Sequence, residues 1–331
     1  MEFNATKELE LSLEEFTMFR DFIHEKCGIF FAENKMYLVK NRLIKRMTDL
    51  GLKSYRDYYY HVKYDTSMKE FNSLMNQITT NETSFFRNEP QLLSFSDEVL
   101  PLLIEEKKTK KNLKIWSAGC STGEEPYTLS IMLLEKLKGL SGWKLEIVAN
   151  DISEQVLQNA RHGEYSGITL RNVKPTILNS YFNKVGENYQ VKPEVKALVN
   201  FSHLNLNDPR KIPMNSNFDV IFCRNVMIYF SSEIKKQLVR SFFNVLNPGG
   251  YFYIGHSETL HGISKAFKLK YFKNALVYSK EAVKTSKENN LNTKSINIRG
   301  NKFTSNKLDP AKGANRALDL LSQLKTASVN K

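Results

Sequence analysis

The first quarter of the chain carries apolar residues at helical spacing and shows few strand signals. Between Leu11 and about Gln77 these residues recur every three or four positions, so they fall on one side of a helix. The repeat is clearest in two stretches, which contain Phe16, Phe19 and Ile23, and then Met36, Val39, Leu43, Met47 and Leu50. The pattern predicts a small helical domain, which together with a polar linker occupies residues 1–88.

From residue 113 onward, short apolar runs alternate with segments of helical spacing. The apolar runs predict strands at 113–116, 145–149, 218–223 and 251–254, and the segments between them predict helices up to 137, at 153–161 and at 232–246. A further helix begins near Asn88 and Pro90 and reaches Glu105. Such alternation predicts an α/β domain, 89–281, with a parallel sheet and helices on both faces. Two final runs, 269–272 and 275–278, would close one sheet edge with an antiparallel strand.

The segment between Gly163 and Asn205 is longer than a simple connection requires. Parts of it at 188–191 and 197–202 look like strands, so we expect a small inserted antiparallel β-element at about 175–204. The last segment, 282–331, is rich in Lys, Asn, Ser and Thr, which predicts a basic, disordered tail. Within this tail the pattern is consistent with an amphipathic helix at 309–325, although an incidental helix is an equally good interpretation.

Length and composition narrow the class of protein. With 331 residues, 41% of them hydrophobic, the chain is long enough to bury the cores of two domains. Cys27, Cys120 and Cys223 are too far apart for a disulfide framework, and neither they nor the histidines form a metal-binding pattern. The N-terminus lacks a signal-peptide pattern, and the sequence has no run of about eighteen apolar residues. We therefore expect a cytoplasmic protein without a transmembrane segment.

The net charge of +13 is distributed unevenly. Residues 282–331 hold ten Lys and Arg against three Asp and Glu, and so contribute +7 of the total. The rest of the chain is only mildly basic, which weakens any inference of nucleic-acid binding from charge. A local excess lies on the second predicted helix, where Lys35, Arg42, Lys45 and Arg46 share the side away from the apolar stripe. This face is either merely solvated or a docking surface for an acidic partner helix.

The most informative segment is 113–127. A strand leads into a turn that contains Gly119 and Gly123, and then into a helix that opens with Glu124 and Glu125. Proteins of the α/β class bind nucleotides at such turns. Two carboxylates would repel a pyrophosphate at the helix N-terminus, but not a ligand that carries an ammonium, a sulfonium and a ribose. The turn therefore favours S-adenosylmethionine over NAD or ATP, although glycine turns of this kind are often purely structural.

Polar residues follow successive strands at one edge of the predicted sheet. Asp151 ends the second strand, where an acidic side chain can accept both ribose hydroxyls or, alternatively, cap the next helix. Asn205 and Leu206 follow a later strand at a place suited to an adenine edge. Arg224 and Asn225 follow the strand after that. Because open α/β sheets bind ligands at the carboxyl ends of their strands, we expect one cofactor site here.

These motifs resemble those of the chemotaxis receptor glutamate O-methyltransferases, the CheR family. The similarity runs from Leu11 to Tyr278 and is most specific at 79–87 (TTNETSFFR), 115–127 (IWSAGCSTGEEPY), 150–152 (NDI), 222–230 (FCRNVMIYF) and 255–258 (GHSE). The resemblance implies a Rossmann-like, class I S-adenosylmethionine-dependent methyltransferase sheet, with S-adenosylhomocysteine as the product. Together with Gly119 of the turn, it implies a cofactor site formed by Asn81, Thr83, Arg87, Glu125, Asp151, Asn205, Leu206, Asn225 and Val226.

The resemblance also implies roles in catalysis and docking. It places Arg87 and Tyr229 nearest the transferred methyl, and it implies that the basic helix around Arg42 to Arg46 reads the acidic methylation helix of a receptor. A glutamate has a pKa of about 4.3 and is already a nucleophile near neutral pH, so the reaction needs placement rather than a general base. We expect Tyr229 to act beside the methyl and Arg87 to position the carboxylate or the cofactor. The alternatives that do not depend on the resemblance are a half-buried aromatic at a strand end for Tyr229 and an interdomain salt bridge for Arg87.

One segment departs from the family pattern. Some members carry a longer, Gly-rich loop in the inserted element, which docks a tethering peptide at the receptor C-terminus. Here the stretch 183–190 is short and holds a single glycine, so we expect no pentapeptide tether. We also expect a monomer that uses no metal.

Two other functions are compatible with parts of the sequence. A nucleic-acid methyltransferase is suggested by the basic charge, but such enzymes usually grip a flipped base with an Asn/Asp-Pro-Pro-Tyr/Phe turn. The equivalent place here, 225–228, reads Asn-Val-Met-Ile. A non-catalytic signalling or scaffold protein that binds S-adenosylmethionine is the second alternative.

Overall fold

A computed structural model describes residues 9–79, 82–138, 141–212 and 217–282. All of them belong to a single structural unit of the chain, so the helices and the sheet can be described together. Three expectations lie outside the described residues. They are Asn81 of the expected cofactor site, the disorder expected for the tail, of which only residue 282 is described, and the helix expected within it at 309–325.

Four helices build the N-terminal part: α1 (Leu13–Cys27), α2 (Met36–Leu50), α3 (Tyr55–Tyr64) and α4 (Lys69–Ile78), with a 3-10 turn η1 (Glu33–Lys35) before α2. The helical spacing therefore predicted this part correctly. α1 begins with a capping box in which Ser12 and Glu15 bond each other's main-chain N–H groups, and it ends at Gly28, whose φ is 78°. Many apolar side chains of these helices, such as Phe16, Phe19 and Val39, are fully buried in one shared core.

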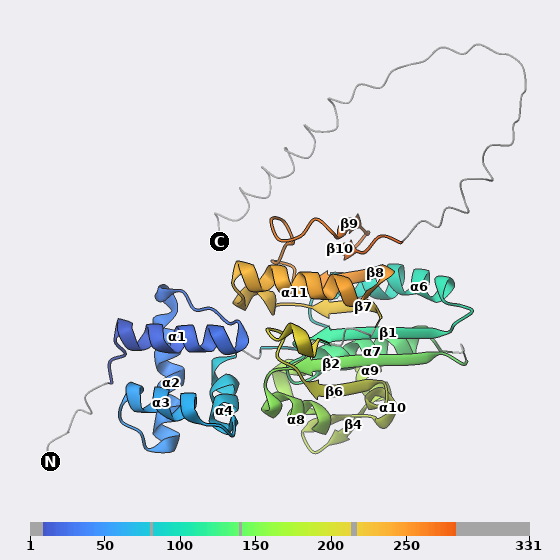
Figure 1. The fold of residues 1–331 in the computed structure, drawn as a ribbon. Coiled ribbons are helices and arrows are strands. Elements are labelled where there is room, and N and C mark those ends of the chain that lie inside the picture. Colours follow the sequence, from blue (N-terminus) through green and yellow to red (C-terminus); the bar gives the residue numbers. More distant parts are fainter. Residues whose placement is uncertain (1–8, 80–81, 139–140, 213–216, 283–331) are drawn as a thin grey trace, which may run out of the picture. The chain divides into compact units, whose positions relative to one another are not determined.

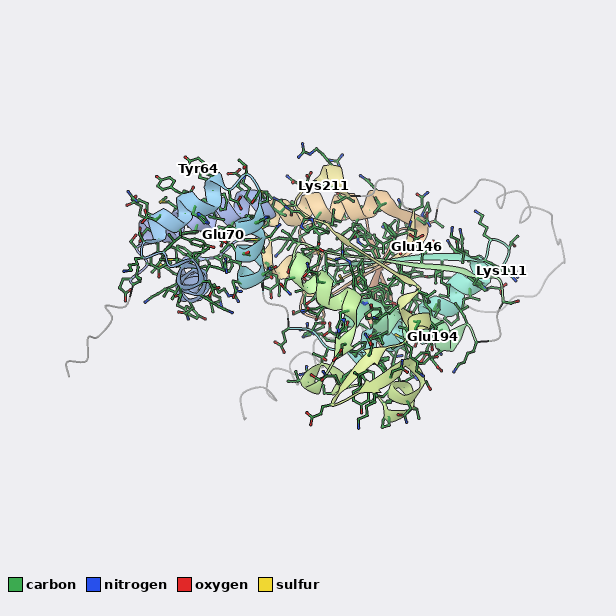
Figure 2. The ribbon with its side chains drawn as sticks, turned by 90° about the horizontal axis from the view of Figure 1, so that it is seen from below. Tyr64, Glu70, Lys111, Glu146, Glu194 and Lys211 are labelled. Carbon is green, nitrogen blue, oxygen red and sulfur yellow. The ribbon has the colours of Figure 1, made fainter. Side chains whose placement is uncertain are left out.

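A buried ion pair joins three of these helices. Arg46 on α2 donates from Nε and Nη2 to the carboxylate of Glu70 on α4, at 3.0 and 2.8 Å. Tyr58 on α3 donates its hydroxyl to the same carboxylate at 2.8 Å. Glu70 lies among the N-terminal helices (Figure 2), and its side chain is only 8% exposed. Arg46 also pairs with Asp49 at 2.8 Å. The expectation that Arg46 stands on an exposed face is therefore wrong, because its acidic partners could not be recognised from the helix alone.

Seven strands form the central sheet, in the order β6-β2-β1-β7-β8-β10-β9 (Figure 1). Their bounds are β1 (Asn112–Ala118), β2 (Lys144–Asp151), β6 (Val199–His203), β7 (Phe218–Cys223), β8 (Leu246–Ile254), β9 (Lys268–Tyr271) and β10 (Leu276–Ser279). The first five in this order are parallel, and β10 is antiparallel to both of its neighbours. The strand order reverses at β1 and β7, so their carboxyl ends flank the place where open α/β sheets bind ligands.

Helices cover both faces of this sheet, as the alternating pattern predicts (Figure 1). Successive side chains of β1 point to opposite faces and so enter two different cores. Trp116 packs on one face with α11 (Ser232–Val245) and shares a core with the N-terminal helices. Ile115 packs on the other face with α7 (Glu124–Lys136). The helix α8 (Glu154–His162) follows β2 and contributes Leu157 to that second core.

The helix expected from Asn88 to Glu105 is present in three consecutive pieces. They are α5 (Glu89–Leu93), the π-helical segment η2 (Ser94–Val99) and α6 (Leu100–Glu106). Pro101 explains the irregular middle piece, because proline donates no main-chain N–H and its ring collides with the carbonyl four residues earlier in a regular helix. A wider turn in front of the proline relieves this conflict.

The inserted β-element differs from its expected bounds of about 175–204. It is an antiparallel sheet of β3 (Glu164–Tyr165), β5 (Asn188–Val191) and β4 (Phe182–Val185), in that order, with 3-10 turn η3 (Gly167–Leu170) and helix α9 (Pro175–Tyr181) between β3 and β4. A short helix, α10 (Pro193–Lys196), follows it. The strand expected at 197–202 is β6 of the central sheet, where Val199 pairs with Ile147 of β2. An apolar run predicts a strand but not its distant partner, which is why this assignment was wrong.

We expect the substitution Glu70→Ala to lower the free energy of unfolding by about 3 kcal/mol, because it leaves the guanidinium of Arg46 partly buried without its main partner. Urea unfolding measures this loss. Glu14→Ala is the matched control, since Glu14 pairs with Arg56 at 2.8 Å but both side chains are more than half exposed. That change should cost less than about 1 kcal/mol. Equal losses in the two variants would contradict a structural role for the buried pair.

Candidate active site

A pocket opens at the carboxyl ends of β1, β2, β6 and β7. It encloses about 1130 Å³ of space without protein atoms, part of which is open solvent. All the expected cofactor and catalytic residues within the described part of the chain line this pocket. They are Thr83, Arg87, Gly119, Glu125, Asp151, Asn205, Leu206, Asn225, Val226 and Tyr229. The linker before α5 and the C-terminal end of α1 complete the wall.

The turn after β1 brings the main chain close to the far wall of the pocket. Gly119 has a φ of 79° and donates its N–H to the carbonyl oxygen of Asn150 at 2.8 Å. A Cβ at this position would lie 2.4 Å from Cγ2 of Val226, which is closer than side chains approach. Glycine is therefore required here both for the backbone conformation and for the space beside Val226.

Asp151 stands at the end of β2 with its carboxylate oriented by main-chain donors. Its Oδ2 accepts the N–H of Ser121 at 2.8 Å, and its Oδ1 accepts the N–H of Ser153 at 3.0 Å. Burial raises the pKa of Asp151, while these two hydrogen bonds lower it in part. Each carboxylate oxygen keeps a further lone pair, so Asp151 can accept two neighbouring hydroxyls of a ligand.

The two glutamates at the start of α7 have different surroundings. Glu124 is buried, accepts a hydrogen bond from Oγ1 of Thr122 at 2.7 Å, and is not among the residues that line the pocket. Its pKa is raised by burial. Glu125 faces the pocket, where it accepts from Oγ of Ser117 at 2.7 Å and from Nη1 of Arg224 at 3.1 Å. The argument that both carboxylates stand where a phosphate would bind therefore holds for Glu125 but not for Glu124, which the helix turns into the protein.

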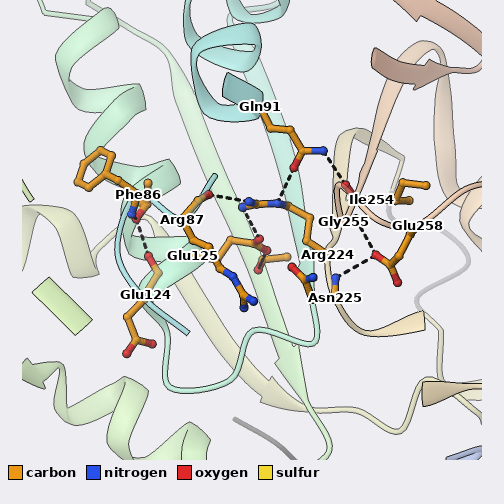
Figure 3. Close-up of polar contacts among 12 residues, drawn as sticks. Phe86, Arg87, Gln91, Glu124, Glu125, Arg224, Asn225, Ile254, Gly255 and Glu258 are labelled. Carbon is orange, nitrogen blue, oxygen red and sulfur yellow. Dashed lines mark hydrogen bonds and ion pairs between the residues drawn. The ribbon is translucent and has the colours of Figure 1, made fainter. Parts of the chain in front are cut away.

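A buried guanidinium connects Glu125 to the linker that carries Arg87 (Figure 3). Arg224 donates from Nε to Oε1 of Gln91 at 2.9 Å, from Nη1 to Glu125, and from Nη2 to the main-chain oxygen of Arg87 at 2.6 Å. Gln91 in turn donates to the carbonyl oxygen of Ile254, at the end of β8, at 2.7 Å. These bonds fix the start of α7 and the linker before α5, which both line the pocket, relative to β7.

Arg87 extends its side chain along the pocket wall. Its Nη1 donates to the main-chain oxygen of Glu82 at 2.7 Å. This contact is with a carbonyl group, so the structure does not support the alternative that Arg87 serves an interdomain salt bridge. The guanidinium has further N–H groups that can donate to a ligand, and Arg87 lines the pocket together with Tyr229.

Asn205 joins the sheet edge to the N-terminal helices. Its Nδ2 donates to the carbonyl oxygen of Lys26 at 2.6 Å, and its Oδ1 accepts the N–H of Asn207 at 3.0 Å. Protein groups thus use one N–H and one lone pair of the side-chain amide, which leaves one of each for a ligand. An adenine ring in this part of the pocket would meet the main chain here and the buried apolar side chain of Leu206.

Two serine hydroxyls point to a polar ligand and were missed from the sequence. Oγ of Ser84 and Oγ of Ser121 are buried, line the pocket and have no hydrogen-bond partner among the described residues. A buried hydroxyl without a partner is costly, so a ligand with polar groups would be stabilised here. Ser121 lies within the glycine turn and Ser84 follows Thr83, so their positions beside predicted site residues were the available signal. The two serine hydroxyls, the carboxylates of Asp151 and Glu125 and the apolar walls fit S-adenosylmethionine.

The four residues expected to form a docking surface do not share one exposed face. Lys35 and Lys45 are exposed, whereas Arg42 is partly buried and Arg46 is paired with Glu70. Arg42 donates from Nη1 to the main-chain oxygen of Ile78, which lines the pocket. Burial lowers the pKa of Arg42, and the nearby hydroxyl group of Tyr229 raises it in part. Arg42 therefore stands beside the pocket rather than on the outer face of α2.

The cysteines and the possible metal-ligating residues do not indicate another kind of catalytic site. Burial raises the pKa of the Cys120 and Cys223 thiols well above the ordinary range, so neither is a ready nucleophile. Across the described ranges, no group of three or more His, Cys, Asp or Glu side chains is arranged to hold a metal ion. None of the described helices is long and apolar enough to cross a membrane.

Comparisons with known proteins agree with the geometry of the pocket. Residues 14–79 match the family described as CheR methyltransferase, all-alpha domain, and residues 81–276 match CheR methyltransferase, SAM binding domain. The chain is 36% identical to chemotaxis protein methyltransferase 2 of Vibrio cholerae, over 82% of this chain and 95% of that protein. It is also 36% identical to chemotaxis protein methyltransferase 1 of Pseudomonas aeruginosa, over 80% of this chain and 97% of that protein.

The two matched domains correspond to the N-terminal helices and to the sheet that carries the pocket. The cofactor is S-adenosylmethionine, and the protein is an enzyme that methylates another protein. Both the resemblance noted in the sequence and the Rossmann-like fold expected from it are confirmed. The chain belongs to the CheR methyltransferase family.

Proposed function

We propose that this enzyme transfers the methyl group of S-adenosylmethionine to glutamate side chains of chemotaxis receptors, giving glutamate methyl esters and S-adenosylhomocysteine. One observation carries the proposal: a single pocket brings the carboxylates of Asp151 and Glu125 together with Arg87 and Tyr229. The relatives are named chemotaxis protein methyltransferases, which supports receptors as the substrate. The enzyme would act in the cytoplasm. It would work as a monomer, since one chain supplies all of these groups.

The pocket residues suggest how the cofactor is held. Asp151 accepts the ribose hydroxyls, and Glu125 accepts the ammonium group at the amino-acid end. Leu206 and Val226 provide apolar surface, and the hydroxyls of Ser84 and Ser121 gain the polar partner that they lack. When bound, S-adenosylmethionine supplies an electrophilic methyl group on its sulfonium.

The protein's part in the reaction is placement. A glutamate carboxylate is already charged near neutral pH, so no residue needs to remove a proton from it. Arg87 and Tyr229 orient the incoming carboxylate, and the N-terminal helices exclude water from one side of the pocket. Arg42 adds a positive charge beside Tyr229. The exposed Lys35, which directly precedes α2, and the exposed Lys45 on α2 attract an acidic receptor helix.

The direct test incubates the enzyme with labelled S-adenosylmethionine and receptor cytoplasmic fragments. We expect label on glutamate that alkali releases as methanol, because methyl esters are hydrolysed by base and N-methyl groups are not. Asp151→Ala is the cofactor-site control and should transfer little label. Alkali-stable label on added nucleic acid would instead support the nucleic-acid methyltransferase, and binding of cofactor without any transfer would support the scaffold alternative.

We expect Tyr229→Phe to lower kcat by roughly 10- to 100-fold, which corresponds to losing one hydrogen bond to a charged group. The ring is kept, so the affinity for S-adenosylhomocysteine should change little. Steady-state methylation of receptor fragments and calorimetry measure the two quantities. Unchanged turnover in this variant would remove the hydroxyl from the mechanism.

We expect the affinity for S-adenosylhomocysteine to weaken as the pH falls from neutral through the raised pKa of Asp151. The raised pKa of Asp151 means that this carboxyl takes up a proton at a higher pH than the usual value of about 3.9, and it then loses acceptor capacity. The dissociation constant rises by at most tenfold per pH unit. Asp151→Asn should bind more weakly but show a flatter pH profile. The same slope in both proteins would exclude Asp151 as the titrating group.

We expect the inserted β-element to lack affinity for a receptor C-terminal pentapeptide. Its strands β4 and β5 are joined by a two-residue turn, Gly186 and Glu187, which leaves no long loop to receive a peptide. Fluorescence titration with a labelled pentapeptide tests this, with a scrambled peptide as control. Saturable binding of the receptor peptide alone would refute the prediction.

A further inference from the structure

The loop that follows β7 carries five pocket residues, Arg224, Asn225, Val226, Tyr229 and Phe230. Asn225 has a φ of 59°, a left-handed conformation that is uncommon outside glycine. A short 3-10 turn, η5 (Met227–Tyr229), comes directly after it. Such a loop keeps its shape only where its main-chain donors find partners. The partners of these donors therefore decide where Tyr229 stands.

The carboxylate of Glu258 accepts hydrogen bonds from two main-chain donors of this loop and from Gly255. Figure 3 shows Glu258 beside Asn225 and Gly255. Oε2 of Glu258 accepts the N–H of Asn225 at 2.9 Å and that of Gly255 at 2.6 Å, and its Oε1 accepts the N–H of Ile228 at 3.0 Å. Gly255 directly follows β8, so Glu258 ties the loop after β7 to the end of the neighbouring strand. Hydrogen bonds to a charged acceptor are stronger and better directed than neutral ones.

Gly255 makes room for this carboxylate. A Cβ at residue 255 would lie 2.6 Å from Oε2 of Glu258 and 2.9 Å from the main-chain nitrogen of Asn225. Both distances are shorter than real contacts, so a larger residue must displace the carboxylate or the loop. The spacing of Gly255 and Glu258 in the sequence motif thus has a physical reason in the structure.

We propose that Glu258 is a positioning residue for methyl transfer, whose carboxylate holds the Asn225–Tyr229 loop in its place at the pocket. Glu258 is not among the described residues that line the pocket, so it acts through the loop rather than on the ligand. The inference rests on the proposed function, because that function places Tyr229 beside the transferred methyl. A displacement of about 1 Å at a reacting centre is enough to slow a reaction by roughly 100-fold.

The apolar side chains under the loop are buried independently of Glu258, so loss of its carboxylate should affect the position of the loop more than the stability of the fold. Met227 and Phe230 anchor the loop in the apolar core, where each is at most 9% exposed. Glu258 is only partly buried, and Ile228 is exposed. Removing the carboxylate therefore loosens the main chain of the loop while the core beneath it stays filled.

The test compares two substitutions that break the contact between Glu258 and the loop in different ways. Glu258→Gln keeps the length of the side chain but replaces one acceptor oxygen with an NH2 group. Gly255→Ala leaves the carboxylate intact but displaces it or the main chain of Asn225, so that the contact between them is broken. We expect each to lower kcat for receptor methylation by roughly 10- to 100-fold, with an unchanged KM for the receptor fragment. The double variant should be no slower than the slower single variant, because both changes remove one contact. Ser257→Ala, at an exposed neighbour, is the control and should keep the wild-type kcat.

A wild-type kcat in Glu258→Gln, or losses that add up in the double variant, would overturn the proposal. If the wild-type enzyme forms no ester, the proposed function fails instead, and a second measurement then tests the role of Glu258 without activity. Hydrogen exchange on the wild-type protein should find the amides of Asn225, Ile228 and Gly255 protected. Amide exchange as fast as that of an exposed loop would overturn the proposal. Because this measurement uses the wild-type protein, it remains decisive even if a variant does not fold.

Discussion

The pocket depends on one buried cation. Arg224 follows β7, and its guanidinium cannot be left unpaired in the protein interior, because an isolated buried charge is far more costly than the bonds that satisfy it. Its partners come from α5, from α7 and from the linker before α5, so these segments must meet where β7 ends. The places of Glu125 and Arg87 at the pocket follow from this requirement.

The N-terminal helices are part of the same arrangement. Nδ2 of Asn205 and Nδ2 of Asn207 donate to the last carbonyl oxygens of α1, at 2.6 and 3.2 Å, and Ile29 forms an isolated β-bridge with Phe230. Ser153 at the start of α8 bonds Asn76 on α4. The helices therefore contribute a wall to the pocket. This arrangement is suited to a reaction that needs a dry site and close placement rather than a strong acid or base.

Much of this could be predicted from the sequence because the patterns involved are local. The apolar runs located the strands, and polar residues directly after them, such as Asp151 and Asn225, lie at one sheet edge. Contacts between distant residues were not predictable in this way. Glu70 lies 24 residues from Arg46, and β6 pairs with β2 across an inserted element. The direction of Glu124 likewise depends on how α7 packs, and it could not be read from its neighbours.

The central claim is that the sheet edge holds one S-adenosyl nucleoside per chain, and calorimetric titration of the purified enzyme with S-adenosylhomocysteine tests it most directly. The account predicts saturable binding at one site per chain, lost or at least about tenfold weaker in Asp151→Ala. That variant must unfold in urea like the wild type for the comparison to hold. Folded wild-type protein that takes up no S-adenosylhomocysteine, or an Asp151→Ala variant that binds it equally well, would contradict the account.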